Sequence, residues 1–125
     1  MPFVELGAEK IFYDHSPVSG GRVLLPIHGS GADHRSWPEG LRRLPAAAVI
    51  TPDLPGHGRS TGSGRSRVSD YAEVVAAFAE RLALNNVVLM GHSLGGAIVL
   101  RLALGAPDWL AAIVLVGTGA RLKVD

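Results

Sequence analysis

The pattern of apolar and polar positions along this chain predicts both β-strands and α-helices. A β-hairpin pattern surrounds Gly7, in residues 3–6 and 10–14. Runs that are apolar at nearly every position, as in strands buried on both faces, occupy residues 22–27, 46–51, 86–90 and 112–116. Helix-start signals or helical spacing are found in residues 36–44, 69–82 and 94–104. From residue 22 onward strands alternate with helices, which predicts an α/β fold with a mostly parallel sheet and flanking helices.

Finer features predict how some of these segments are capped and buried. Ser36 and Glu39 have the spacing of a capping box, with Pro38 in the first turn of the short helix. The segment 94–104 is apolar nearly all round, so we expect a buried central helix. The run 112–116 is expected to be one more buried strand.

The length and composition are ordinary for a globular protein with one core. The chain of 125 residues is 47% hydrophobic and 18% charged, which disfavours disorder. Its net charge is +1 and its ten arginines and two lysines are scattered, so nucleic acid is not an expected partner. The absence of cysteine excludes disulfides, thiolate catalysis and cysteine-based zinc sites. Nothing in the sequence indicates a metal or a cofactor.

No segment has the pattern of a membrane anchor. Residues 1–5 lack the basic start and apolar stretch of a secretory signal. The longest apolar region, residues 87–106, is interrupted by His92, Ser93 and Arg101 and by glycines. We therefore expect no membrane partner and a cytoplasmic location.

Residues 91–95, Gly-His-Ser-Leu-Gly, join a predicted strand to a predicted helix and have the pattern of a nucleophile elbow. A serine hydroxyl becomes an effective nucleophile when a sharp turn holds it near a base and near donors for the oxyanion. Gly91 and Gly95 fit such a turn, because a Cβ at either position would press on it, and Gly96 lets the helix lie close to the sheet. The N–H of Leu94, at the start of the helix, would point toward the developing negative charge.

Four motifs follow one another along the chain. They are residues 28–31 (His-Gly-Ser-Gly) with Trp37 downstream, 53–60 (Asp-Leu-Pro-Gly-His-Gly-Arg-Ser), 91–96 (Gly-His-Ser-Leu-Gly-Gly) and 113–121 (Ile-Val-Leu-Val-Gly-Thr-Gly-Ala-Arg). Together they resemble the successive signatures in the first half of the α/β-hydrolase fold family. The resemblance covers almost the whole chain and implies an α/β-hydrolase-type sheet that is incomplete, without the C-terminal strands, helices and lid of the family.

This resemblance implies a serine hydrolase. Ser93 would be the nucleophile, and the backbone N–H groups of Ser30 and Leu94 would form the oxyanion hole. Dehalogenases and epoxide hydrolases of the family use aspartate at the elbow, so serine makes small-molecule esters the leading substrates. Lactones, amides, some carbon–carbon bonds and perhydrolase chemistry stay open. No cofactor is implied.

The chain departs from the family pattern at the catalytic triad. In the family the order is serine, acid, histidine, yet all five histidines of this chain precede Ser93. We expect His28, His57 and His92 to pack or to fix loops, since none has an orienting partner placed for it as a base. Asp108 falls in a predicted surface turn. We therefore interpret residues 1–125 as the N-terminal portion of one core domain, truncated so that the acid and the histidine are missing.

Two hypotheses of different classes follow. In the first, the chain is a serine hydrolase whose acid and histidine come from missing sequence, from another polypeptide or from an assembly. In the second, it is a catalytically inactive remnant that binds a ligand or a partner. Nucleotide binding is disfavoured, because no glycine-rich fingerprint follows the first strand. The bare edge expected at residues 112–116 also predicts a homo-oligomer or association with a complementing polypeptide.

Overall fold

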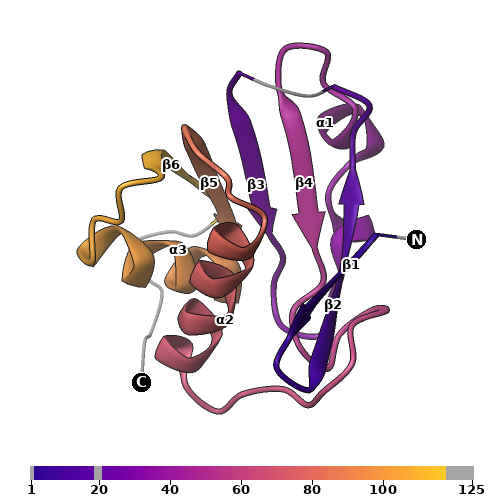
Figure 1. Cartoon of the computed structure of the whole chain (residues 1–125), viewed down its shortest axis with the longest axis vertical. Helices are drawn as coiled ribbons and strands as arrows, with labels where there is room; N and C mark the ends of the chain where they lie inside the picture. Colours follow the sequence, from indigo (N-terminus) through magenta and orange to yellow (C-terminus); the bar gives the residue numbers. More distant parts are fainter. Residues whose placement is uncertain (1, 19–20, 118–125) are drawn as a thin grey trace.

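Six strands form a single sheet in the computed structural model, which describes residues 2–18 and 21–117 (Figure 1). The strands are β1 (Phe3–Leu6), β2 (Glu9–His15), β3 (Val23–Ile27), β4 (Ala48–Pro52), β5 (Val87–His92) and β6 (Leu110–Val116). The helices are a 3₁₀ turn at His34–Ser36, α1 (Glu39–Arg42), α2 (Val68–Arg81) and α3 (Leu94–Leu104). Figure 1 shows α2 and α3 together on one side of the sheet and α1 on the other.

The strand order is β1-β2-β4-β3-β5-β6. β1 and β2 form the predicted hairpin, and β2 pairs antiparallel with β4. From β4 through β3 and β5 to β6 all pairings are parallel, so the predicted mostly parallel sheet is confirmed. β4 is buried at every position, as expected for a strand that is covered on both faces. The parallel arrangement brings the carboxyl ends of four strands, and the loops that follow them, to one edge of the sheet.

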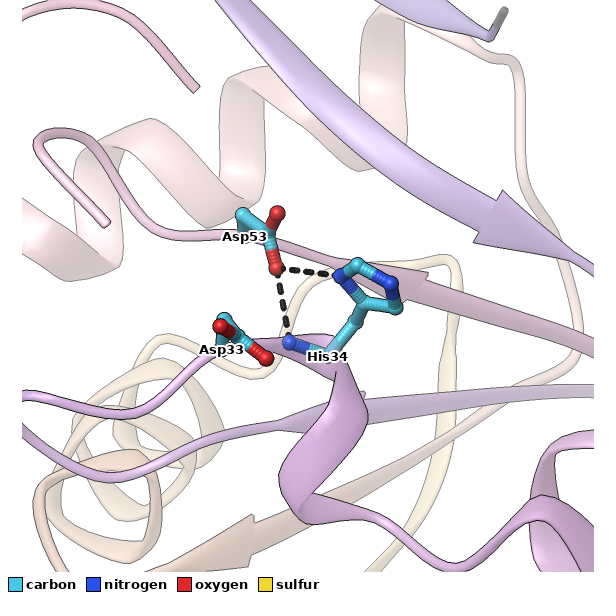
Figure 2. A group of neighbouring side chains, drawn as sticks. All are labelled: Asp33, His34 and Asp53. Carbon is cyan, nitrogen blue, oxygen red and sulfur yellow. Dashed lines mark hydrogen bonds and ion pairs between the residues drawn. The ribbon is translucent and has the colours of Figure 1, made fainter. Parts of the chain in front are cut away.

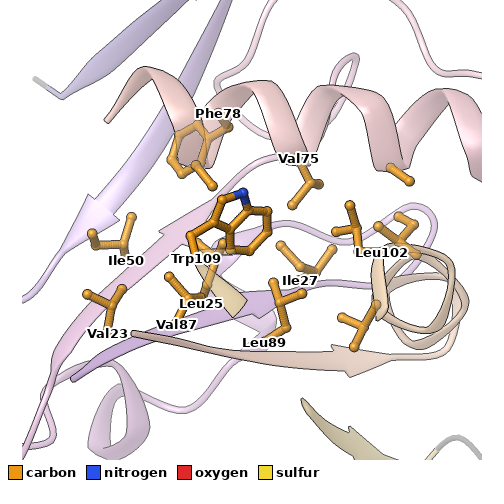
Figure 3. Close-up of a cluster of buried hydrophobic side chains, with 14 of the residues drawn as sticks. Val23, Leu25, Ile27, Ile50, Val75, Phe78, Val87, Leu89, Leu102 and Trp109 are labelled. Atoms are coloured by element: carbon orange, nitrogen blue, oxygen red, sulfur yellow. The ribbon is translucent and has the colours of Figure 1, made fainter. Parts of the chain in front are cut away.

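The main core lies between the sheet and the pair α2 and α3 (Figure 3). Val75 and Phe78 of α2 and Leu102 of α3 belong to one cluster with Leu89 of β5, and Trp109 lies between α2 and the strands. Each of these side chains is at most 8% exposed. Burying one large apolar side chain stabilises a fold by about 1.5–3 kcal/mol, so this layer holds the sheet and both helices together.

The sequence predicts the bounds of α3 correctly and its burial in part, since six of its 11 residues are buried. Leu100 is 40% exposed and Leu104 is 80% exposed, although the rest of the helix packs on β5, β6 and α2. The strand β6 differs in the same way: Val114, Leu115 and Val116 are 36–42% exposed. β6 pairs with β5 alone among the described strands, so its expected bare edge is observed while its expected burial is wrong. No described helix is long and apolar enough to span a bilayer.

The predicted capping box between Ser36 and Glu39 does not form. Ser36 instead ends the 3₁₀ turn, and its hydroxyl donates to the carbonyl of Asp33 at 2.9 Å. Trp37 is extended (φ −86, ψ 131), because the residue before a proline is disfavoured in the helical region. The α1 helix therefore starts afresh at Glu39, with Pro38 as its N-cap and no side-chain cap bond.

Candidate active site

Ser93 lies on a sharp turn between the end of β5 and the start of α3. Its φ of 57° and ψ of −116° form a combination that residues with a side chain rarely adopt, so the backbone is strained at this position. Ser93 is exposed, at the same sheet edge as the loops after β3 and β4. The strand, the turn and the helix thus occur where the sequence predicts a nucleophile elbow.

The elbow glycines are required by close backbone contacts. A Cβ on Gly91 would collide with the carbonyl of Gly95 and lie 2.6 Å from the Cα of Gly96. A Cβ on Gly95 would collide with the carbonyl of Ile27 and lie 2.8 Å from that of His28. The predicted crowding is confirmed, but for Gly95 the crowded partner is the end of β3 and not the turn itself.

The loop after β3 lies directly beside Ser93. A Cβ built on Gly29 would be 3.4 Å from the Cβ of Ser93 and 3.4 Å from the carbonyl oxygen of His92. Gly29 also opens a tight turn, in which its carbonyl accepts from the N–H of Ala32 at 3.2 Å. Gly31 has φ +75, as the third position of a type II turn requires.

Two backbone N–H groups are candidate oxyanion donors. Leu94 is the first residue of α3, where helical N–H groups have no partner inside the helix. Ser30 follows Gly29 in the adjacent loop. Within residues 2–18 and 21–117, neither N–H donates to a protein acceptor. Ser93 and Leu94 thus share one turn, and the Gly29–Ser30 loop lies beside it.

His28 is fully buried and is held as a neutral ring. Its Nε2 accepts from the N–H of Leu54 at 3.0 Å, and its Nδ1 lies 2.6 Å from the carbonyl oxygen of Gly29, to which it donates. Burial lowers the pKa of His28 below its ordinary 6.5. Since the Nε2 lone pair is occupied, His28 cannot accept a proton from a serine; it fixes the loops, as the sequence analysis expects.

This arrangement predicts acid-sensitive stability. Because the folded-state pKa of His28 is lowered, the unfolded chain takes up this proton first as the pH falls. The contribution is complete above about pH 6.5 and is lost as the pH falls through the folded pKa, with a slope of at most about 1.4 kcal/mol per pH unit. Urea unfolding between pH 7.5 and 5 should show this slope, and His28→Asn should reduce it. An equal slope in His28→Asn and in the exposed control His15→Asn would contradict the assignment.

The other two histidines near the strand ends lie against neighbouring loops. The ring of His92 lies between two loops, since a Cβ on Gly29 would be 3.6 Å from its Nδ1 and a Cβ on Gly117 would be 3.3 Å from its Nε2. The Nδ1 of His57 is 3.0 Å from the carbonyl oxygen of Pro55. These contacts agree with the expectation that both rings pack or fix loops.

A cluster that the sequence analysis does not identify lies in the loops after β3 and β4 (Figure 2). One ligand-type atom from each of Asp33, His34 and Asp53 lies within 4.8 Å of the others. Asp33 is paired with the Arg35 guanidinium at 2.8 Å, which holds the pKa of Asp33 at about 2. The cluster has no local sequence signal, because His34 and Asp53 are 19 residues apart. Its oxygens are occupied by protein donors, so we assign no metal to it.

A surface hollow of about 260 Å³ lies away from Ser93. It is lined by residues of α2 and of α3 and its C-terminal turn, including Glu73, Arg101 and Pro107, and by neither Ser93 nor Ser30. It is not part of the candidate site.

The profile of the alpha/beta hydrolase fold family matches residues 22–124 of the sequence. The chain belongs to the α/β-hydrolase fold family. This α/β-hydrolase chain is 36% identical over 104 residues to Lipase LipV of Mycobacterium tuberculosis (strain ATCC 25618 / H37Rv). The aligned region covers 83% of this chain and 40% of the lipase. It is 43% identical over 90 residues to the magnesium-chelatase 30 kDa subunit of Rhodobacter capsulatus. That alignment covers 70% of this chain and 32% of the subunit.

A solved structure of a thermophilic esterase has the same fold, with a TM-score of 0.80 and 34% sequence identity. The match covers 98% of this α/β-hydrolase chain and 46% of the esterase. The chain thus spans less than half the length of each of these three relatives.

Proposed function

We propose that this chain carries the nucleophile of a serine hydrolase that cleaves carboxylic esters through an acyl-enzyme on Ser93. The observation that carries the proposal is the strained turn at Ser93, directly beside the Gly29–Ser30 loop and at the start of α3. The family supports a hydrolase, and two of its similar members are named as a lipase and an esterase. The substrate is a small-molecule ester or a related acyl compound, and the proposal includes neither a metal nor a cofactor.

In the proposed reaction the Ser93 hydroxyl oxygen attacks the ester carbonyl carbon while a base removes its proton. The carbonyl oxygen becomes an oxyanion, to which the N–H groups of Ser30 and Leu94 donate. The C–O bond to the alcohol then breaks, the alcohol leaves with the proton, and water later releases the acid from Ser93. Loss of one such donor costs about 10²–10³ in rate in other acyl-transfer enzymes. The N-terminal end of α3 adds a favourable dipole at the same place.

We further propose that the base and its acid partner belong to polypeptide other than residues 1–125. No histidine follows Ser93 in this sequence, and the lone pair of His28 is already bonded. A histidine from a complementing polypeptide would have to approach Ser93 at the sheet edge, where the residue is exposed.

The bare edge of β6 is proposed to drive association. Within the described chain this edge has no neighbouring strand, and Val114, Leu115 and Val116 expose apolar side chains without a charge among them. Such an edge pairs readily with another chain. Analytical ultracentrifugation should show a dimer or larger species, and Val114→Lys should shift the distribution toward monomer. A monodisperse monomer of the parent chain at all concentrations would contradict this.

Labelling with a p-nitrophenyl phosphonate tests the nucleophile. We expect stoichiometric labelling confined to Ser93, detected by intact mass and peptide mapping, because phosphonate attack uses the same serine and the same oxyanion donors. Ser93→Ala and denatured protein should remain unlabelled. Failure of the chain to be labelled, both alone and fused to a segment that supplies an acid and a histidine, would favour the inactive binding module instead.

A further inference from the structure

Asp53 directly follows β4, and its carboxylate is fully buried. One oxygen, Oδ1, accepts from the backbone N–H of His34 at 2.7 Å and from its ring Nδ1 at 2.9 Å (Figure 2). The other, Oδ2, accepts from the backbone N–H of Arg59 at 3.0 Å. Burial of a carboxylate is strongly unfavourable unless its oxygens are hydrogen-bonded, so these donors and the carboxylate hold one another in place.

Asp53 and the residue after it contact both ends of the loop that follows β3. At the start of the loop, the Leu54 N–H donates to the ring of His28. At its end, His34 is bonded to Asp53 through both its backbone and its ring. Two consecutive residues after β4 therefore clamp residues 28–34, the segment that contains the Ser30 N–H.

From this arrangement we infer that Asp53 is a positioning residue of the active site: its carboxylate fixes the loop that presents the Ser30 N–H to the oxyanion. The inference rests on the proposed function, in which Ser30 is an oxyanion donor. Pre-organised donors are effective because they need no reorientation during the reaction, and a loop rich in glycine has little stiffness of its own. Between its two clamped ends, the loop is closed by the turn bond from the Ala32 N–H to the Gly29 carbonyl.

Close packing argues against a metal as the occupant of this cluster. Gly58 lies against the carboxylate, since a Cβ on Gly58 would collide with Asp53 and lie 2.9 Å from the Cβ of Asp33. Both carboxylate oxygens of Asp53 already accept N–H groups, and the Asp33 oxygens bond Arg35. The cluster is therefore a hydrogen-bonded joint between two loops.

The test compares Asp53→Asn and His34→Ala with the parent chain. Asp53→Asn keeps the size of the side chain but loses one acceptor and the charge, whereas His34→Ala removes the ring bond and the ring contact with Phe12 but keeps the backbone bond to Asp53. Asp14→Asn is the matched control, because Asp14 is likewise a carboxylate held by hydrogen bonds, but its donors are the side chains of Arg42 and Arg43 and it lies on β2, away from residues 28–34. Two quantities are measured: the ¹⁵N order parameters of Ser30 and Gly31, and the concentration dependence of Ser93 labelling by the p-nitrophenyl phosphonate.

For Asp53→Asn we expect the Ser30 order parameter to fall from about 0.85 to below about 0.6. We also expect the maximal labelling rate to fall about tenfold or more, with the half-saturating phosphonate concentration within about twofold of the parent value. His34→Ala should lower the Ser30 order parameter and the maximal labelling rate by smaller amounts. Asp14→Asn should change neither of them. A purely structural role for Asp53 would lower the unfolding temperature without this selective loss of maximal rate.

Unchanged order parameters and labelling in a folded Asp53→Asn protein would overturn the inference. If Asp53→Asn fails to fold, unchanged order parameters and labelling in His34→Ala would overturn the inference. A parent chain that stays unlabelled both alone and fused to a segment that supplies an acid and a histidine would instead contradict the proposed function, and the order parameters would still show whether Asp53 clamps the loop.

Discussion

Purified residues 1–125 are expected to hydrolyse p-nitrophenyl acetate and butyrate close to the background rate. Ser93 has two candidate oxyanion donors, Ser30 and Leu94, but we expect it to lack a general base in this chain: the lone pair of His28 is bonded, and His57 and His92 are expected to pack or to fix loops. In other serine hydrolases that have lost triad members, the oxyanion hole and binding leave only about 10³–10⁴ over the reaction in water. Removal of the triad costs about 10⁶ in kcat in another serine hydrolase, so such a residual rate is small beside that of a complete enzyme.

Addition of an acid and a histidine should raise this activity clearly. The segment can be taken from the part of the thermophilic esterase that this chain does not match, because the two folds superpose over 98% of the chain. It is supplied by fusion or as a separate polypeptide, and initial rates are measured with the same esters. Ser93→Ala should abolish the gain. Robust turnover by the chain alone, lost with Ser93→Ala and with one of His28→Ala, His57→Ala or His92→Ala, would show that an upstream histidine is the base.

Gly95→Val should destabilise the fold by about 1–3 kcal/mol, the usual cost of overpacking, although no catalytic group is changed. Gly95 is buried, and its added Cβ would collide with the carbonyl of Ile27. Ile27 pairs with Gly91 in the β3–β5 ladder, so its carbonyl cannot move without opening the sheet beside the elbow. Urea unfolding followed by circular dichroism measures the change.

Two variants serve as controls for this prediction. Gly40→Ala adds a Cβ in α1 with no atom within 4 Å, and it should be neutral or stabilising by up to about 1 kcal/mol. Ser93→Ala keeps the positive φ and should change stability by no more than about 0.5 kcal/mol. A Gly95→Val protein as stable as the parent would remove the steric argument for the elbow.

Local sequence patterns determined the elements and the elbow of this protein. Continuous apolar runs predicted β3, β4 and β5, because a strand covered on both faces has no polar side. The elbow was predictable because its strand, its serine, its glycines and its helix are consecutive in the sequence, within residues 87–104. Where two local rules compete, the prediction failed: the proline after Trp37 overrode the capping-box spacing of Ser36 and Glu39.

Only the tertiary structure decided which loops meet and which apolar faces are covered. Gly29 lies beside Ser93, and Asp53 bonds His34, because the sheet places β3 between β4 and β5; no spacing in the sequence encodes that order. An apolar pattern indicates that a segment prefers burial, but it does not determine which other element covers that segment. For this reason α3 and β6 have the expected composition, while Leu104 and Val114 remain exposed in the described chain.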